Sequence, residues 1–213
     1  MSSSPKHLII IGGSVGSLDP ILSIIEPLHS RINAAVVIVK HTEPGSGKFL
    51  GSIVNRHSSL DVEYPAAGDV LTSGVVYIAP PGKVTGFSGR AEVGEVRFDI
   101  TDAQPGATQQ PNIDSCIISA ALAYTDRCIA VVLSGYLDDG TLGAQFLATH
   151  RGITIAQDPQ DASVAYMPQS VIDYDSPSYI LEAEEIAEVL SDICLVGQWP
   201  NAPQSQSYRL SEL

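Results

Sequence analysis

Three residues whose types together can catalyse acyl transfer, Ser14, His41 and Asp139, each lie just past a stretch of apolar residues. A serine hydroxyl becomes an effective nucleophile when a base takes its proton, and histidine can do this near neutral pH. A carboxylate then orients the imidazole and stabilises its charged form. The three residues predict a serine hydrolase. The adjacent Asp138 leaves the register of the acidic member open, although the following Gly140 favours Asp139.

Apolar strands must position these residues. The segments 7–11, 34–39 and 128–133 are almost continuously apolar, as in parallel strands covered on both faces. Helical segments alternate with them, which predicts an α/β fold with a doubly wound, mainly parallel sheet. Open parallel sheets bind ligands at the carboxyl ends of their strands. We therefore expect Ser14, His41 and Asp139 to converge although they are distant in sequence.

The remaining chain adds smaller elements. A strand is expected over 75–79, an antiparallel hairpin excursion over 85–100, and another strand over 153–157. Helices are expected over 18–27, 48–56, 112–125, 141–150, 168–173 and 182–196. The predicted catalytic domain covers 1–197. The segment 198–213, rich in proline, glutamine and serine, is predicted to be a flexible tail.

Glycines surround Ser14 in a tight strand-to-helix turn, where small neighbours let the hydroxyl project. The helix start that follows offers backbone N–H groups, with Val15 and Gly16 as candidates, to a developing oxyanion. The order serine, histidine, aspartate differs from the serine, aspartate, histidine order of α/β-hydrolases. The turn also lacks the signatures of common phosphate-binding loops.

Several segments, in order along the chain, resemble motifs of the CheB-type chemotaxis protein-glutamate methylesterase catalytic domain. They are IIGGSVG at 10–16, VKHTEPG at 39–45, GVVYIAP at 74–80, PNID at 111–114, LSGYLDDG at 133–140 and YMP at 166–168. The family motifs that they resemble are I-G-A-S-T-G, Q-H-M-P-P-G, G-x-x-Y-I-A-P, P-S-V-D, L-T-G-M-G-x-D-G and G-M-P. The resemblance implies that Ser14, His41 and Asp139 form the catalytic triad and that a backbone amide near Tyr136 contributes to the oxyanion hole.

The resemblance further implies demethylation of glutamate methyl esters on a chemoreceptor, with glutamine deamidation as a neighbouring activity and no metal or organic cofactor. Departures from the family pattern alter the rim of the pocket. Val15 stands where the family has a threonine, and Leu137 stands where it has a glycine. Gln110 and Val84 occupy positions where the family has basic residues. Two alternatives therefore stay open. One is a diverged, weakly active or inactive binding or regulatory module, and the other is an esterase for a non-chemotactic substrate.

The composition restricts the partners. A formal net charge of −13 disfavours nucleic acid and anionic membrane surfaces. No apolar run approaches the roughly 20 residues that span a bilayer, so no membrane insertion is expected. Cys116, Cys128 and Cys194 are widely spaced, which favours buried thiols in the cytoplasm. Few residues precede the first strand, so we expect no receiver domain in the same chain.

Overall fold

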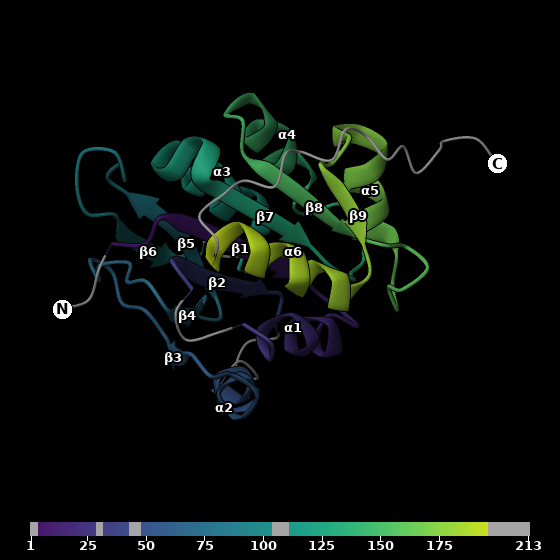
Figure 1. Cartoon of the computed structure of the whole chain (residues 1–213), viewed down its shortest axis with the longest axis horizontal. Coiled ribbons are helices and arrows are strands. Elements are labelled where there is room, and N and C mark those ends of the chain that lie inside the picture. The colour runs from purple at the N-terminus through teal and green to yellow at the C-terminus, as the bar shows by residue number, and fades with distance from the viewer. Residues whose placement is uncertain (1–3, 29–31, 43–47, 104–110, 196–213) are drawn as a thin grey trace.

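The computed structural model describes residues 4–28, 32–42, 48–103 and 111–195, and its centre is a seven-stranded sheet (Figure 1). The strand order is β3-β4-β2-β1-β7-β8-β9, and every neighbouring pair is parallel. The strands are β1 (His7–Gly13), β2 (Ala34–Lys40), β3 (Asp61–Glu63), β4 (Val75–Ile78), β7 (Cys128–Val132), β8 (Ile153–Gln157) and β9 (Tyr179–Leu181). The predicted doubly wound parallel sheet is confirmed.

Helices cover both faces of this sheet. One face carries α1 (Leu18–Ile25), α2 (Lys48–His57) and α6 (Ala183–Leu195), and α6 crosses the front of the sheet in Figure 1. The other carries α3 (Ile113–Tyr124), α4 (Thr141–Thr149) and α5 (Tyr166–Asp175). Each face has its own hydrophobic core, which explains why the central strands are apolar at every position rather than at alternate ones.

Strand β1 illustrates this division of the core. Its residues are all buried; Leu8 and Ile10 point into the core beneath α3, whereas Ile9 and Ile11 point into the core beneath α1 and α6. Successive side chains of a strand alternate between faces, so a strand buried on both faces needs an unbroken apolar run. The run also holds β1 in the middle of the sheet, between β2 and β7.

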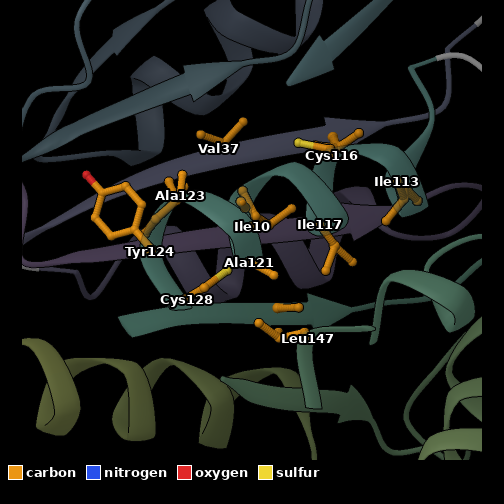
Figure 2. Close-up of a cluster of buried hydrophobic side chains, with 14 of the residues drawn as sticks. Ile10, Val37, Ile113, Cys116, Ile117, Ala121, Ala123, Tyr124, Cys128 and Leu147 are labelled. Carbon is orange, nitrogen blue, oxygen red and sulfur yellow. The ribbon is translucent and has the colours of Figure 1, made fainter. Parts of the chain in front are cut away.

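Helix α3 is the most deeply buried helix next to the site. Figure 2 shows its apolar side chains gathered with Ile10 of β1, Val37 of β2 and Cys128 of β7. A glycine makes the close approach possible. A Cβ atom on Gly12 would lie only 2.5 Å from Cγ2 of Ile113. The first turn of α3 can therefore rest directly on the carboxyl end of β1.

The predicted hairpin is present as a separate two-stranded antiparallel sheet, β5 (Lys83–Ser88) and β6 (Arg97–Asp102). It packs Phe98 edge-on against Tyr77, with 4.8 Å between ring centroids. The two outermost strands of the main sheet, β3 and β9, were absent from the sequence prediction. In the described part of the chain, no helix has the length and apolar character needed to cross a membrane.

His7, at the start of β1, predicts acid sensitivity of the fold. It is 5% exposed, and its ring nitrogens have no hydrogen-bond partner among the described residues. Burial lowers its pKa from 6.5 to about 4; the charges of Lys6 and Arg127 act in the same direction, and the nearby Arg127 backbone and the charge of Asp126 oppose them. The unfolded chain therefore binds a proton below pH 6.5 that the native state takes up only near pH 4. His7 should reduce the free energy of unfolding by up to about 3 kcal/mol as the pH falls through this window.

Denaturant unfolding at pH 7 and pH 4.5 tests this expectation. The loss of stability between the two pH values should be smaller by about 2 kcal/mol in His7→Leu than in the wild type. His57→Leu is the control, because His57 lies exposed at the end of α2. Equal acid losses in the wild type and His7→Leu would show that other groups control the acid response.

Candidate functional site

The candidate site lies at the carboxyl ends of the three central strands. In the parallel register Gly13 pairs with Lys40, so Ser14 and His41 each come one residue beyond a paired position. The backbone N–H of His41 donates to the Gly13 carbonyl at 3.0 Å. On the other side of β1, the Leu133 N–H donates to the Gly12 carbonyl at 2.8 Å. The chain leaves β1 towards β2 and later returns to its opposite side at β7, which makes this crevice a topological switch point.

Both backbone polar groups of Ser14, the N–H and the carbonyl, form hydrogen bonds that fix the turn. Its N–H donates to the Ser134 carbonyl at 2.9 Å. Its carbonyl oxygen accepts from the Ser17 N–H at 3.3 Å, the Ser17 hydroxyl at 2.7 Å and the Lys40 ammonium at 2.8 Å. Burial lowers the pKa of Lys40. Lys40 therefore supports the turn that carries Ser14.

His41 and Asp139 form a buried pair. Nε2 of His41 lies 2.7 Å from Oδ2 of Asp139, and the two side chains are 12% and 1% exposed. Asp139 also accepts the N–H groups of Ile113 and Asp114, both at 2.9 Å, and the Asn112 side-chain amide at 3.3 Å. Burial raises the pKa of Asp139, but the hydrogen bonds from His41 and the start of α3 outweigh it and the net direction is downward. Asp139 is thus held as a carboxylate.

This geometry has two chemical consequences. The Asp139 carboxylate is hydrogen-bonded to Nε2 of His41. Nδ1 is therefore the ring nitrogen that is able to take up a proton. Asp139 is 3% exposed, whereas Asp138 is exposed; among the described residues its one hydrogen-bond partner is the Thr141 N–H, which its backbone carbonyl accepts at 3.0 Å. The structure therefore pairs Asp139, and not Asp138, with the histidine.

Ser14 lies half-buried beside this pair and packs closely against Gly135. A Cβ atom on Gly135 would come within 2.8 Å of the Ser14 Cβ, so glycine is required there. Within the described part of the chain, no hydrogen bond joins the Ser14 hydroxyl to His41. Catalytic hydrogen bonds are often long in a substrate-free enzyme and close only around the substrate.

Two of the three predicted oxyanion-hole residues, Val15 and Gly16, follow Ser14 directly, and the third, Tyr136, follows Gly135, which packs against Ser14. No described residue accepts a hydrogen bond from the N–H of Val15, Gly16 or Tyr136. Gly16 has φ +78°, and a Cβ there would lie 2.7 Å from Cβ of Ser163. The Ser134 hydroxyl donates to the Val15 carbonyl at 2.8 Å. The turn after β1 is thereby tied to the loop after β7.

Two exposed apolar side chains follow Gly135 in the loop after β7. Tyr136 is 53% exposed, and its ring stacks on that of Tyr166 with 6.0 Å between centroids. Leu137 is 64% exposed and has φ +66°, a conformation that non-glycine residues rarely adopt. The residue that departs from the family's glycine is therefore a strained one, and it lies two residues before Asp139.

The strain at Leu137 gives a stability prediction. Left-handed backbone costs an L-residue roughly 1–2 kcal/mol, and the greater freedom of glycine in the unfolded chain offsets part of the gain. Leu137→Gly should raise the free energy of unfolding by about 0.5–1 kcal/mol, measured as a higher denaturant midpoint at constant slope. Leu142→Gly is a matched control, because Leu142 is also 64% exposed but lies within α4. It should lose about 1 kcal/mol; a loss of the same size in both variants would contradict strain at Leu137.

The fold and the site define the class: an α/β domain with a serine and a buried histidine–aspartate pair at the switch point of a parallel sheet. The structure is similar to the crystal structure of the Thermotoga maritima CheB methylesterase catalytic domain. The TM-score is 0.84 at 32% sequence identity, over 90% of this chain and 100% of that one. The family model for CheB methylesterase matches residues 9–190. The chain belongs to the CheB methylesterase family.

Relatives of known name support this assignment. The Thermotoga maritima protein-glutamate methylesterase/protein-glutamine glutaminase is 33% identical over 186 residues, which cover 87% of this chain and 54% of the relative. A Leptospira interrogans protein with the same two activities in its name is 30% identical, over 85% of this chain and 91% of its own length. The chain thus spans about half the length of the Thermotoga relative.

Sequence reasoning missed one carboxylate beside the site. Asp114, in the first turn of α3, accepts hydrogen bonds from the start of α4 and lies next to Asp139 in the structure. The segment PNID was available as a signal, because it resembles a motif of the family, but it suggested no role for the aspartate. The side chain of Lys48, the other lysine close to His41 in sequence, lies outside the described residues.

Proposed function

We propose that this chain hydrolyses glutamate methyl esters on a methyl-accepting chemoreceptor or a similar signalling protein, with Ser14, His41 and Asp139 as the catalytic triad. The observation that carries the proposal is the buried His41–Asp139 hydrogen bond at the strand end beside Ser14. Membership of the CheB methylesterase family and the names of the relatives supply the substrate class.

In the proposed reaction, the Ser14 hydroxyl attacks the ester carbonyl while Nδ1 of His41 takes its proton. The N–H groups of Val15, Gly16 and Tyr136 stabilise the oxyanion. His41 then returns the proton to the leaving methanol, and Asp139 stabilises the imidazolium. Water, activated by the same histidine, hydrolyses the acyl-enzyme to the glutamate carboxylate and free Ser14. A glutamine side chain in place of the ester would release ammonia by the same steps.

The experiment is methanol release from a methylated chemoreceptor by the wild type and by Ser14→Ala. Ser88→Ala is the matched control, because Ser88 is exposed on the β5–β6 hairpin. We expect release by the wild type and Ser88→Ala and none above background by Ser14→Ala. Labelling with a fluorophosphonate, which reacts with activated serines, separates the alternatives. No labelling of the folded wild type would favour a binding or regulatory module, and labelling without methanol release would favour an esterase for another substrate.

A further inference from the structure

The start of α3 and the start of α4 cap each other through two aspartates. Asp139, just before α4, accepts the N–H groups of Ile113 and Asp114 at the start of α3. Asp114, within α3, returns the interaction: its Oδ1 accepts the N–H of Gly140 at 2.9 Å and of Gly143 at 2.7 Å, both at the start of α4. The first N–H groups of a helix have no partner within it, so each carboxylate satisfies donors that would otherwise be unpaired.

Two glycines let the helices approach closely enough for this exchange. A Cβ on Gly143 would lie 2.8 Å from Cβ of Ile117 and 3.1 Å from the Asp114 carbonyl oxygen. Gly140 has φ +105°, which L-residues rarely adopt, and its position is crowded by Val132 at 3.1 Å. The contact between α3 and α4 therefore fixes the backbone immediately after Asp139.

We propose that Asp114 is a positioning residue for the reaction: by holding Gly140 and the first turn of α4, it fixes the Asp139 carboxylate against His41. The role in catalysis rests on the proposed function, whereas the positioning of Asp139 stands on the contacts alone. Asp114 makes no hydrogen bond to His41; it positions Asp139 through contacts with Asp139 and Gly140, and its charge acts on His41 only from a distance. The two carboxylates therefore differ in role. Asp139 is hydrogen-bonded to His41, whereas Asp114 is hydrogen-bonded to the start of α4, directly after Asp139.

The protonation states of the pair fit these roles. Burial and the neighbouring Asp139 together raise the pKa of Asp114 to about 6, although the N–H groups of Gly143 and Gly140 oppose the rise. The pKa of Asp139 is shifted in the other direction. When the pair holds one proton, Asp114 therefore carries it, and Asp139 remains the charged partner of His41.

Two substitutions separate the positioning role of Asp114 from its charge. Asp114→Ala removes the acceptor of the Gly140 and Gly143 N–H groups. It should lower kcat by about 10- to 100-fold with little change in KM, because misplacement of a catalytic group affects the transition state more than substrate binding. Asp114→Asn keeps a side-chain oxygen for both donors and should restore kcat to within about fivefold of the wild type.

The pH profile supplies a readout that a purely structural residue would not change. Above pH 6 the wild type has a second negative charge beside the pair, which favours the imidazolium, whereas Asp114→Asn lacks it at every pH. The ratio of Asp114→Asn to wild-type activity should fall as the pH rises through about 6 and level off above it. The control substitutions Glu184→Gln and Glu184→Ala should give a constant ratio, because Glu184 is exposed at the corresponding position of α6.

Nuclear magnetic resonance of ¹⁵N-labelled protein tests the positioning without any substrate. The wild type should show a His41 Nε2–H proton protected from exchange with water. The signal should persist in Asp114→Asn and broaden or disappear in folded Asp114→Ala. A wild type without methanol release overturns the proposed function and leaves this measurement intact. Asp114→Ala with a protected His41 proton and a kcat like that of Glu184→Ala overturns the positioning role.

Discussion

Replacement of either Ser14 or His41 by alanine is expected to lower kcat for ester hydrolysis by about 10⁴-fold or more, and the double variant should be scarcely worse than either single one. Loss of the nucleophile leaves the base without a proton to accept, and loss of the base leaves the nucleophile inactive, so the two effects do not multiply. Methanol release from the three variants, measured at saturating substrate, checks the expectation.

Both variants should fold. The Ser14 hydroxyl makes no hydrogen bond with a described residue, and in His41→Ala the Asp139 carboxylate keeps its three N–H donors from the start of α3. The controls are Ser88→Ala and His57→Ala, which change the same residue types at exposed positions. If the losses in the double variant were instead the product of two large single losses, the two residues would act independently and the triad assignment would be wrong.

The main sheet was predictable because its central strands are buried on both faces. The apolar runs of β1, β2 and β7 predict a parallel sheet, and the parallel register then brings Ser14 and His41 to adjacent strand ends. The two edge strands were not predicted because they are short and are not buried on both faces. β3 and β9 are three residues long, and none of their residues is fully buried. Neither strand therefore needs an apolar run, and only pairing with a neighbour defines it.

The candidate site was predictable in its residue types and only partly in its contacts. The family motifs direct attention to His41 and Asp139, which the structure joins by a hydrogen bond. No local pattern indicates that Asp114, 25 residues before Asp139, accepts hydrogen bonds from the helix after it, because that contact depends on how α3 and α4 pack. The strain at Leu137 was likewise hidden, since backbone conformation follows from the whole loop between β7 and α4.

The second large effect is expected for Asp139→Asn, which should lower kcat by about 10³- to 10⁴-fold. An amide nitrogen in place of Oδ2 would donate to His41 Nε2. This would stabilise the imidazole tautomer that carries its proton on Nδ1, and a protonated Nδ1 cannot act as a base. An amide nitrogen in place of Oδ1 would face the Asp114 backbone N–H. Both groups are donors, so the hydrogen bond would be lost. Neither orientation preserves both the histidine and the helix start.

The same conflict should lower the free energy of unfolding of Asp139→Asn by about 1–3 kcal/mol, because one buried donor of α3 loses its acceptor. Asp138→Asn is the matched control. It changes the neighbouring residue in the same way, but Asp138 is exposed, and within the described ranges only its backbone carbonyl takes part in a hydrogen bond. Ester hydrolysis and denaturant unfolding of the two variants test the assignment together. Equal losses of kcat in Asp138→Asn and Asp139→Asn would mean that long-range charge, rather than the bond from Asp139 to His41, supports the reaction.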